Sequence, residues 1–142
     1  MTREKPLILI VDDEQNLREI FSTKLNASGF ETAVVSSGEE AVQKTEELLP
    51  DLVLMDIKMR GMTGTDAALA IKENPKTEGV KIAFFTSQTD PWPGFSGVGN
   101  NEEAAQELGI DDFLTKTDDL DLNVKKIQDI LARPPRPPRR DM

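Results

Sequence analysis

Five polar side chains of this 142-residue chain follow apolar, strand-like runs, and their types suit phosphoryl chemistry. They are Asp12, Asp13, Asp56, Thr86 and Lys116. Carboxylates placed together repel one another, and a hard divalent cation relieves that repulsion. Carboxylate oxygens suit Mg²⁺, which is usually completed by waters and a phosphate oxygen. A lysine and a threonine beside such a site can hold phosphoryl oxygens, so the set indicates phosphoryl transfer onto an aspartate.

The amino-acid composition excludes several other kinds of catalytic and metal-binding site. The chain has no cysteine and no histidine, which excludes disulfides, thiolate or imidazole metal sites and Ser-His-Asp catalysis. Residues 133–142 carry four Arg and one Asp, so within a total charge of −9 the first 132 residues carry −12. We expect such an acidic body to bind a cation or a basic protein surface and not to bind nucleic acid directly.

Hydropathy points to a protein without a membrane segment. The longest apolar run, residues 7–11, is far too short to cross a bilayer. The six residues before it lack the profile of a signal peptide. We therefore expect a soluble, cytoplasmic protein with no membrane partner.

Apolar runs typical of buried strands alternate with segments of helical period. The expected strands are residues 7–11, 32–35, 52–55, 81–85 and 112–114. The expected helices lie between a cap at Asp13 and a stop at Gly29, from Ser37 to Leu49, over about 65–73, over 101–108 and along the apolar face of 124–131. Five strands alternating with five helices predict an α/β fold, a doubly wound parallel sheet of flavodoxin-like order 2-1-3-4-5. In that order the polar residues meet at one edge.

The remaining segments complete the expected organisation. We expect one domain over residues 1–132, an enlarged Pro- and Gly-rich loop at about 88–100, and a disordered Arg/Pro-rich tail over 133–142. Trp92 and Phe95 in the loop either fold back on the domain or form a partner-binding knob. The tail has two overlapping P-x-x-P spacings that suit an aromatic groove, and a terminus without a dedicated partner fits its composition equally well.

Four short motifs in this order resemble those of the receiver domain of two-component response regulators. They are Ile-Val-Asp-Asp-Glu at 10–14, Leu-Met-Asp-Ile-Lys-Met at 54–59, Phe-Thr-Ser at 85–87 and Phe-Leu-Thr-Lys at 113–116. The resemblance covers residues 7–131 and implies that Asp56 is the phosphoacceptor. It implies that Mg²⁺ is held by Asp12, Asp13, Asp56 and the backbone carbonyl of Lys58.

The same resemblance implies how the phosphoryl group is used. Lys116 would pair with it, Thr86 would reorient to hydrogen-bond it, and Phe113 would turn inward as a switch, although Phe113 is equally compatible with plain core packing. The donor would be a phosphohistidine on a sensor histidine kinase or a histidine phosphotransfer protein. The output would be a protein bound through the face of the fourth and fifth helices, without a separate enzymatic substrate.

The sequence also departs from the family pattern. Thr117 follows Lys116, where the family usually has a proline in a cis bond, and Arg60 stands where a proline is frequent. The 29 residues between Thr86 and Lys116 exceed the usual length. These departures leave room for a degenerate receiver that docks without phosphorylation. An aspartate-nucleophile phosphatase is a further alternative, but it needs an acid two residues after its nucleophile, where this chain has Lys58.

Overall fold

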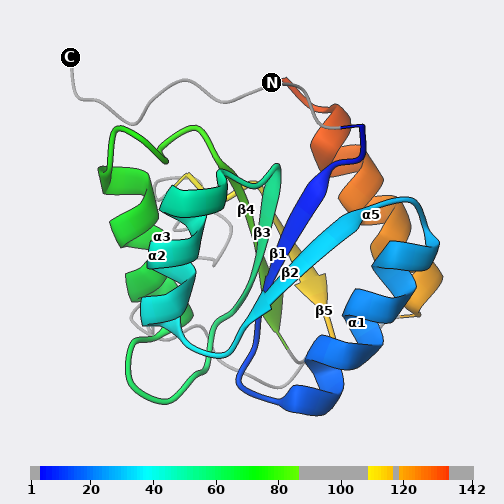
Figure 1. Ribbon diagram of the computed structural model, residues 1–142, viewed down its shortest axis with the longest axis horizontal. Coiled ribbons are helices and arrows are strands. Elements are labelled where there is room, and N and C mark those ends of the chain that lie inside the picture. The colour runs from blue at the N-terminus through cyan, green and yellow to red at the C-terminus, as the bar shows by residue number, and fades with distance from the viewer. Residues whose placement is uncertain (1–3, 87–108, 117–118, 135–142) are drawn as a thin grey trace, which may run out of the picture.

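Five parallel strands form the centre of the computed structural model, which describes residues 4–86, 109–116 and 119–134 (Figure 1). In chain order the elements are β1 (Leu7–Val11), α1 (Gln15–Ala27), β2 (Glu31–Val35), α2 (Gly38–Leu48), β3 (Leu52–Asp56), α3 (Gly64–Glu73), β4 (Lys81–Thr86), β5 (Asp112–Thr115) and α5 (Leu120–Ala132). The strand order is β2-β1-β3-β4-β5, and every neighbouring pair is parallel. The doubly wound, flavodoxin-like order expected from the sequence is confirmed.

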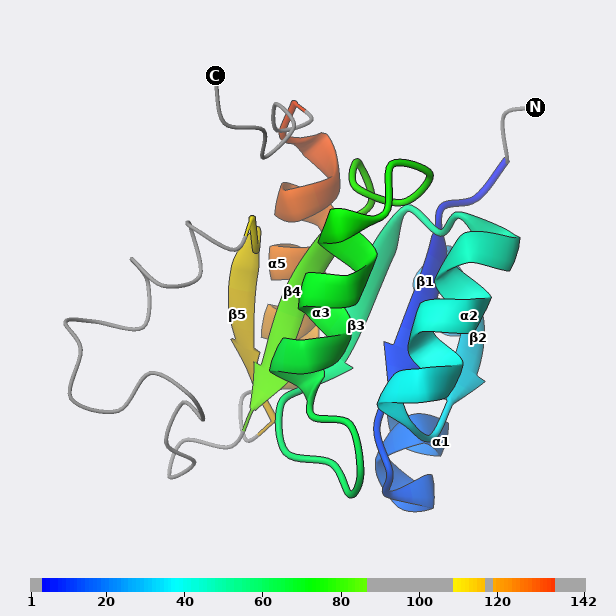
Figure 2. The same ribbon diagram turned by 90° about the vertical axis from the view of Figure 1, so that its left-hand side faces the viewer.

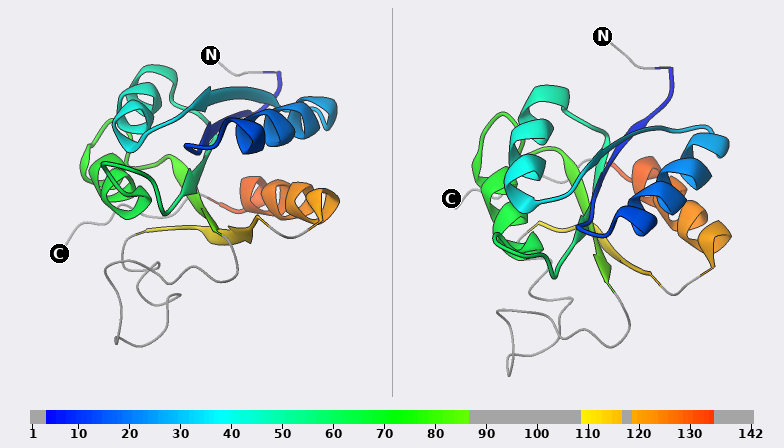
Figure 3. Two further views of the ribbon diagram at one scale, coloured as in Figure 1. Left: turned by 90° about the horizontal axis from the view of Figure 1, so that it is seen from below. Right: turned by 60° about the horizontal axis from the view of Figure 1, so that its bottom comes forward.

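Two helices cover each face of the sheet. Figure 2 shows α2 and α3 side by side on one face, and Figure 3 shows α1 and α5 on the other. The core is therefore divided into two layers. Alternate residues of β1 show the division, because Leu9 and Val11 pack on the side of α2 and α3, whereas Ile8 and Ile10 pack on the side of α1 and α5. All five residues of β1 and of β3 are buried, which explains why these strands have continuous apolar sequences.

Local signals set most of the helix ends. Ser37 caps α2 by accepting a hydrogen bond from the backbone N–H of Glu40 at 3.1 Å. Thr63 caps α3 in the same way, so this helix begins at Gly64, one residue before the expected start. Gly29 follows the end of α1 with φ +99°, a conformation that favours glycine.

The prediction that Asp13 caps the first helix is wrong. The N-cap residue is Glu14, and its side chain makes no capping hydrogen bond. The backbone N–H of Glu14 instead donates to the Asp12 carboxylate at 2.9 Å. Asp13 is not used as a cap because its carboxylate lies near those of Asp12 and Asp56, as described below.

Several sequence predictions fall outside the described residues. These are the helix expected over 101–108, the loop at 88–100 with Trp92 and Phe95, the tail beyond residue 134 and the peptide between Lys116 and Thr117. Four helices lie within the described part, so the expected fifth stays a prediction. Among the described residues no helix is both long and apolar enough to cross a membrane.

Candidate functional site

The sheet register brings the polar residues to one edge. Val11 pairs with Met55, so Asp12 and Asp56 follow at the same level on adjacent strands. Asp56 in turn pairs with Phe85 on β4. The strands therefore end together, and the left view of Figure 3 looks toward this edge from below. This is the carboxyl-end edge where ligands bind in open α/β sheets.

Three carboxylates gather at this edge, as the sequence predicts. Ligand oxygens of Asp12, Asp13 and Asp56 all lie within 4.8 Å of one another. Asp12 is fully buried, Asp56 is only 2% exposed, and Asp13 is half-buried at the rim. A cap or surface role does not account for two buried carboxylates side by side, because burial of unpaired charge is costly.

Lys116 reaches into the same cluster from the end of β5. Its Nζ atom lies 3.1 Å from Asp12 Oδ2 and 3.1 Å from Asp56 Oδ1. The Lys116 side chain is only 13% exposed, so the alternative of a solvated surface lysine is wrong. Burial acts to lower the pKa of Lys116, but the charges of Asp56 and Asp12 outweigh it and the pKa is raised. The ammonium therefore stays charged at neutral pH.

For Asp56, burial and the neighbouring negative charges favour the neutral form of the side chain. Burial first, and then the charge of Asp12, raise the pKa of Asp56 from 3.8 to about 7. Lys116 opposes this shift without cancelling it. The Lys116 ammonium is shared by Asp12 and Asp56. The exposed Arg60 approaches Asp13 at 3.9 Å. Asp56 is thus poised between its protonated and ionised forms near neutral pH.

The cluster fits a hard divalent cation. The Oδ2 atom of Asp12 is buried, and the ammonium that lies 3.1 Å from it is shared with Asp56. Carboxylate oxygens are the donors that Mg²⁺ prefers, and the charge of such an ion would relieve the repulsion between the buried carboxylates. The donor set of Asp12, Asp13 and Asp56 is therefore suited to such an ion.

The backbone around Asp12 is held by a residue that the sequence reasoning missed. Arg18, one turn into α1, donates from Nη1 to the Asp12 carbonyl oxygen at 2.8 Å. The Asp12 N–H donates to the Val35 carbonyl at 3.3 Å. These bonds fix the segment that carries Asp12 and Asp13. The sequence places Arg18 in the first helix, close to the end of β1. It does not show that the Arg18 side chain turns back toward the Asp12 carbonyl.

The segment after Asp56 depends on Gly64. The Gly64 N–H donates to the Ile57 carbonyl at 2.9 Å, and a Cβ added to Gly64 would lie 2.1 Å from the Asp56 carbonyl oxygen. Only glycine permits this contact. Lys58 and Asp13 help to line a hollow of about 320 Å³ beside the cluster. The role of the Lys58 carbonyl as a metal ligand stays a prediction.

The two switch residues are only partly tested. Thr86 ends β4 and pairs with Thr115, which places its backbone at the site edge, and its side chain lies outside the described structure. Phe113 is half-buried, and its ring lies 5.9 Å from that of Phe84, centroid to centroid. This packing agrees with a core role and is also compatible with a switch, so the switch role stays a prediction.

Known proteins with the same fold and related sequences support the architecture. The receiver domain of a sensor histidine kinase from Pseudomonas aeruginosa superposes with a TM-score of 0.76 at 22% identity, covering 91% of this chain and 99% of that one. That protein has a magnesium ion coordinated in its active site cleft. A chain assigned as a response regulator from Chloroflexus aurantiacus gives a TM-score of 0.78 at 29% identity, covering 92% and 100%.

Sequence comparison identifies the relatives. The DNA-binding response regulator MtrA of Mycobacterium tuberculosis H37Rv is 36% identical over 109 residues, which is 77% of this chain and 43% of MtrA. The phosphate regulon regulatory protein PhoB of Rhizobium meliloti is 29% identical over 78% of this chain and 45% of PhoB. The chain thus spans less than half the length of these relatives. A family model of the response regulator receiver domain matches residues 8–128. The chain therefore belongs to the receiver domain family of two-component response regulators.

Proposed function

We propose that Asp56 accepts a phosphoryl group from a phosphohistidine in an Mg²⁺-dependent reaction, and that the phosphorylated chain signals by altering a protein-binding face. The observation that carries this proposal is the position of Lys116, whose ammonium lies 3.1 Å from Asp56 Oδ1 inside a cluster of three carboxylates. The donor belongs to a sensor histidine kinase or a histidine phosphotransfer protein.

Each residue has a distinct part in this reaction. An ionised Asp56 oxygen attacks phosphorus, the bond from phosphorus to the donor nitrogen breaks, and an acyl phosphate forms. Lys116 stabilises the negative charge of the transferred group, since its ammonium already lies beside the attacking carboxylate. Asp12, Asp13 and Asp56 would hold Mg²⁺ together with the Lys58 carbonyl. When bound, this ion would supply further positive charge to the phosphoryl oxygens.

The cluster favours the phosphoacceptor over the two alternatives. A degenerate docking module would lack an acid or the lysine, whereas all four converge here. A phosphatase needs an acid two residues after its nucleophile to protonate a leaving group, and Lys58 stands there. We propose no separate enzymatic substrate.

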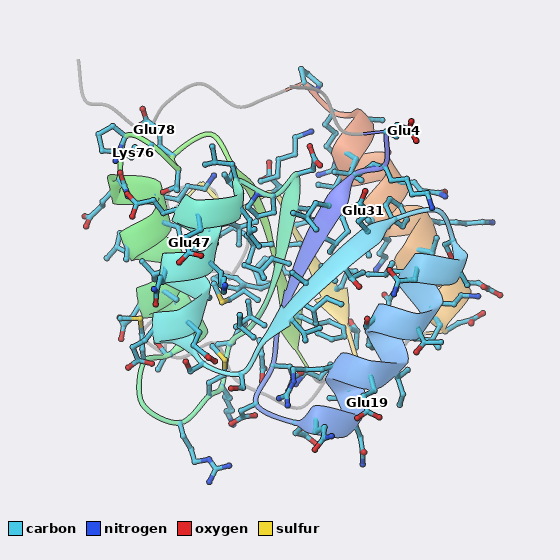
Figure 4. All side chains as sticks on the ribbon, viewed as in Figure 1. Glu4, Glu19, Glu31, Glu47, Lys76 and Glu78 are labelled. Carbon is cyan, nitrogen blue, oxygen red and sulfur yellow. The ribbon has the colours of Figure 1, made fainter. Side chains whose placement is uncertain are left out.

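The partners are proteins in this proposal. Negative charge is spread over the body, as Glu19, Glu31 and Glu47 show on the surfaces of α1, β2 and α2 (Figure 4). Such a surface does not favour direct contact with nucleic acid. MtrA is a DNA-binding protein, but this chain spans only 43% of its length. We propose that the output partner binds a face that includes α5 and β5, the strand that Lys116 follows.

Intact mass spectrometry tests the proposal. The full chain is incubated with acetyl phosphate and Mg²⁺, and we expect one added phosphoryl group. Omission of Mg²⁺ and the variant Asp56→Asn should each abolish the added mass. An unchanged mass for the native chain, or a phosphoryl group retained by Asp56→Asn, would overturn the assignment.

A further inference from the structure

An aromatic ring lies under the ammonium of Lys116. The Nζ atom is 5.6 Å from the centroid of the Phe85 ring, within the range of cation–π attraction. The carboxylates of Asp12 and Asp56 approach the same ammonium at 3.1 Å. Phe85 is fully buried, so this ring replaces water on its side of Lys116. The ammonium is thus held by two anions and the face of a ring.

The Phe85 ring is itself fixed. It belongs to the core layer under α1 and α5, where Phe21 contacts it edge to face with a centroid distance of 4.5 Å and an interplanar angle of 80°. Register places Phe85 between Asp56 on β3 and Leu114 on β5. A ring packed between these neighbours presents a defined surface to Lys116.

We propose that Phe85 is a positioning residue for Lys116, holding its ammonium toward Asp56 through the negative face of the ring. This role rests on the proposed acceptance of a phosphoryl group by Asp56. The ring can keep its contact when Lys116 pairs with a phosphoryl oxygen, because it lies on the apolar side of the ammonium. An aliphatic side chain would fill the same space without attracting the charge.

The chain contains a matched control at the preceding residue. Phe84 is as fully buried as Phe85, but it belongs to the opposite core layer and contacts Phe113. Fluorination of a phenyl ring weakens its negative face and changes its shape little. We therefore replace Phe85, and separately Phe84, with mono- and trifluorinated phenylalanine. This series separates the attraction between ring and ammonium from the packing of the ring.

Two measurements on the whole 142-residue chain test the proposal. The first is the affinity for beryllofluoride with Mg²⁺, a mimic of the phosphoryl group on Asp56. We expect it to fall in steps with fluorination at 85, to a total of about two- to tenfold, and to stay constant with fluorination at 84. The second is the NMR shift of the Lys116 Cε protons. We expect them upfield in the native protein and moved downfield in Phe85→Leu but not in Phe84→Leu.

The outcomes separate this role from the proposed function. If the native protein binds beryllofluoride and fluorination at 85 changes its affinity no more than fluorination at 84, Phe85 does not position Lys116. Unshifted Lys116 protons in the native protein also overturn the contact. If the native protein binds no beryllofluoride, the proposed function fails, whatever the NMR shifts of Lys116 show.

Discussion

Replacing Asp56 with asparagine should stabilise the metal-free fold, because the native side chain is buried among like charges. Asp56 is 2% exposed, and burial together with the charge of Asp12 raises its pKa from 3.8 to about 7. In the unfolded chain the Asp56 side chain is exposed to water, and its pKa has the ordinary value. Asparagine keeps the shape of the side chain and removes the charge.

The magnitude and its sign follow from that pKa. A difference of about 3 units corresponds to about 4 kcal/mol. Between pH of about 4 and 7 the folded chain binds a proton that the unfolded chain has lost, so the free energy of unfolding falls as pH rises through this window. Above the pKa that Asp56 has in the folded chain, the folded state bears the full free-energy cost of the buried charge. We therefore expect Asp56→Asn to be about 2–4 kcal/mol more stable than the native chain at pH 8 without divalent cations, and nearly equal to it at pH 4.

Urea unfolding followed by circular dichroism, in a chelating buffer at pH 4 and pH 8, measures the difference. Asp66→Asn serves as the control, because Asp66 is an exposed acid in the first turn of α3 and its loss should be slightly destabilising. Added Mg²⁺ should stabilise the native chain more than Asp56→Asn. A variant no more stable than the native chain at pH 8 would refute the account of a strained, metal-free cluster.

Three further changes test the surroundings of the cluster. Lys116→Met should slow labelling by acetyl phosphate by about 10²- to 10³-fold while Mg²⁺ still binds by calorimetry; near-native labelling would contradict a role for the ammonium. Arg18→Gln should weaken Mg²⁺ binding about fivefold in the same calorimetric assay, through a lost hydrogen bond worth ~1 kcal/mol, and unchanged affinity would show that the Asp12 backbone needs no such support. Gly64→Ala should lower the free energy of unfolding by on the order of 3 kcal/mol, because its Cβ would lie 2.1 Å from the Asp56 carbonyl oxygen. Urea unfolding measures this change, and a native-like value would mean that the loop relaxes easily.

Fold and cluster were predictable because both follow from simple periodicity. Continuous apolar runs such as Leu7–Val11 are typical of strands buried on both faces, and alternation with helices leaves few topologies. The carboxyl ends of parallel strands then share an edge, which is enough to bring Asp12, Asp56 and Lys116 together.

Contacts that depend on tertiary geometry were not predictable in this way. Asp13 is of a residue type that often caps helices and precedes α1, which favoured a capping role. Its carboxylate instead lies in the cluster, and Glu14 takes the cap position. Arg18 and Phe85 act on the site from within a helix and a strand, where sequence gives only an amphipathic residue and an apolar one. The close approach of Gly64 to the Asp56 carbonyl likewise appears only when α3 is packed on the sheet.

The central claim is that Asp56 itself carries the phosphoryl group. Borohydride reduces an aspartyl phosphate to homoserine, so treatment of the chain after incubation with acetyl phosphate and Mg²⁺ marks the acceptor covalently. Peptide mass mapping should then find homoserine at position 56 and at no other aspartate, with the mark lost when Mg²⁺ is withheld. Homoserine at another position, or none at all in a chain that binds Mg²⁺, would contradict the claim.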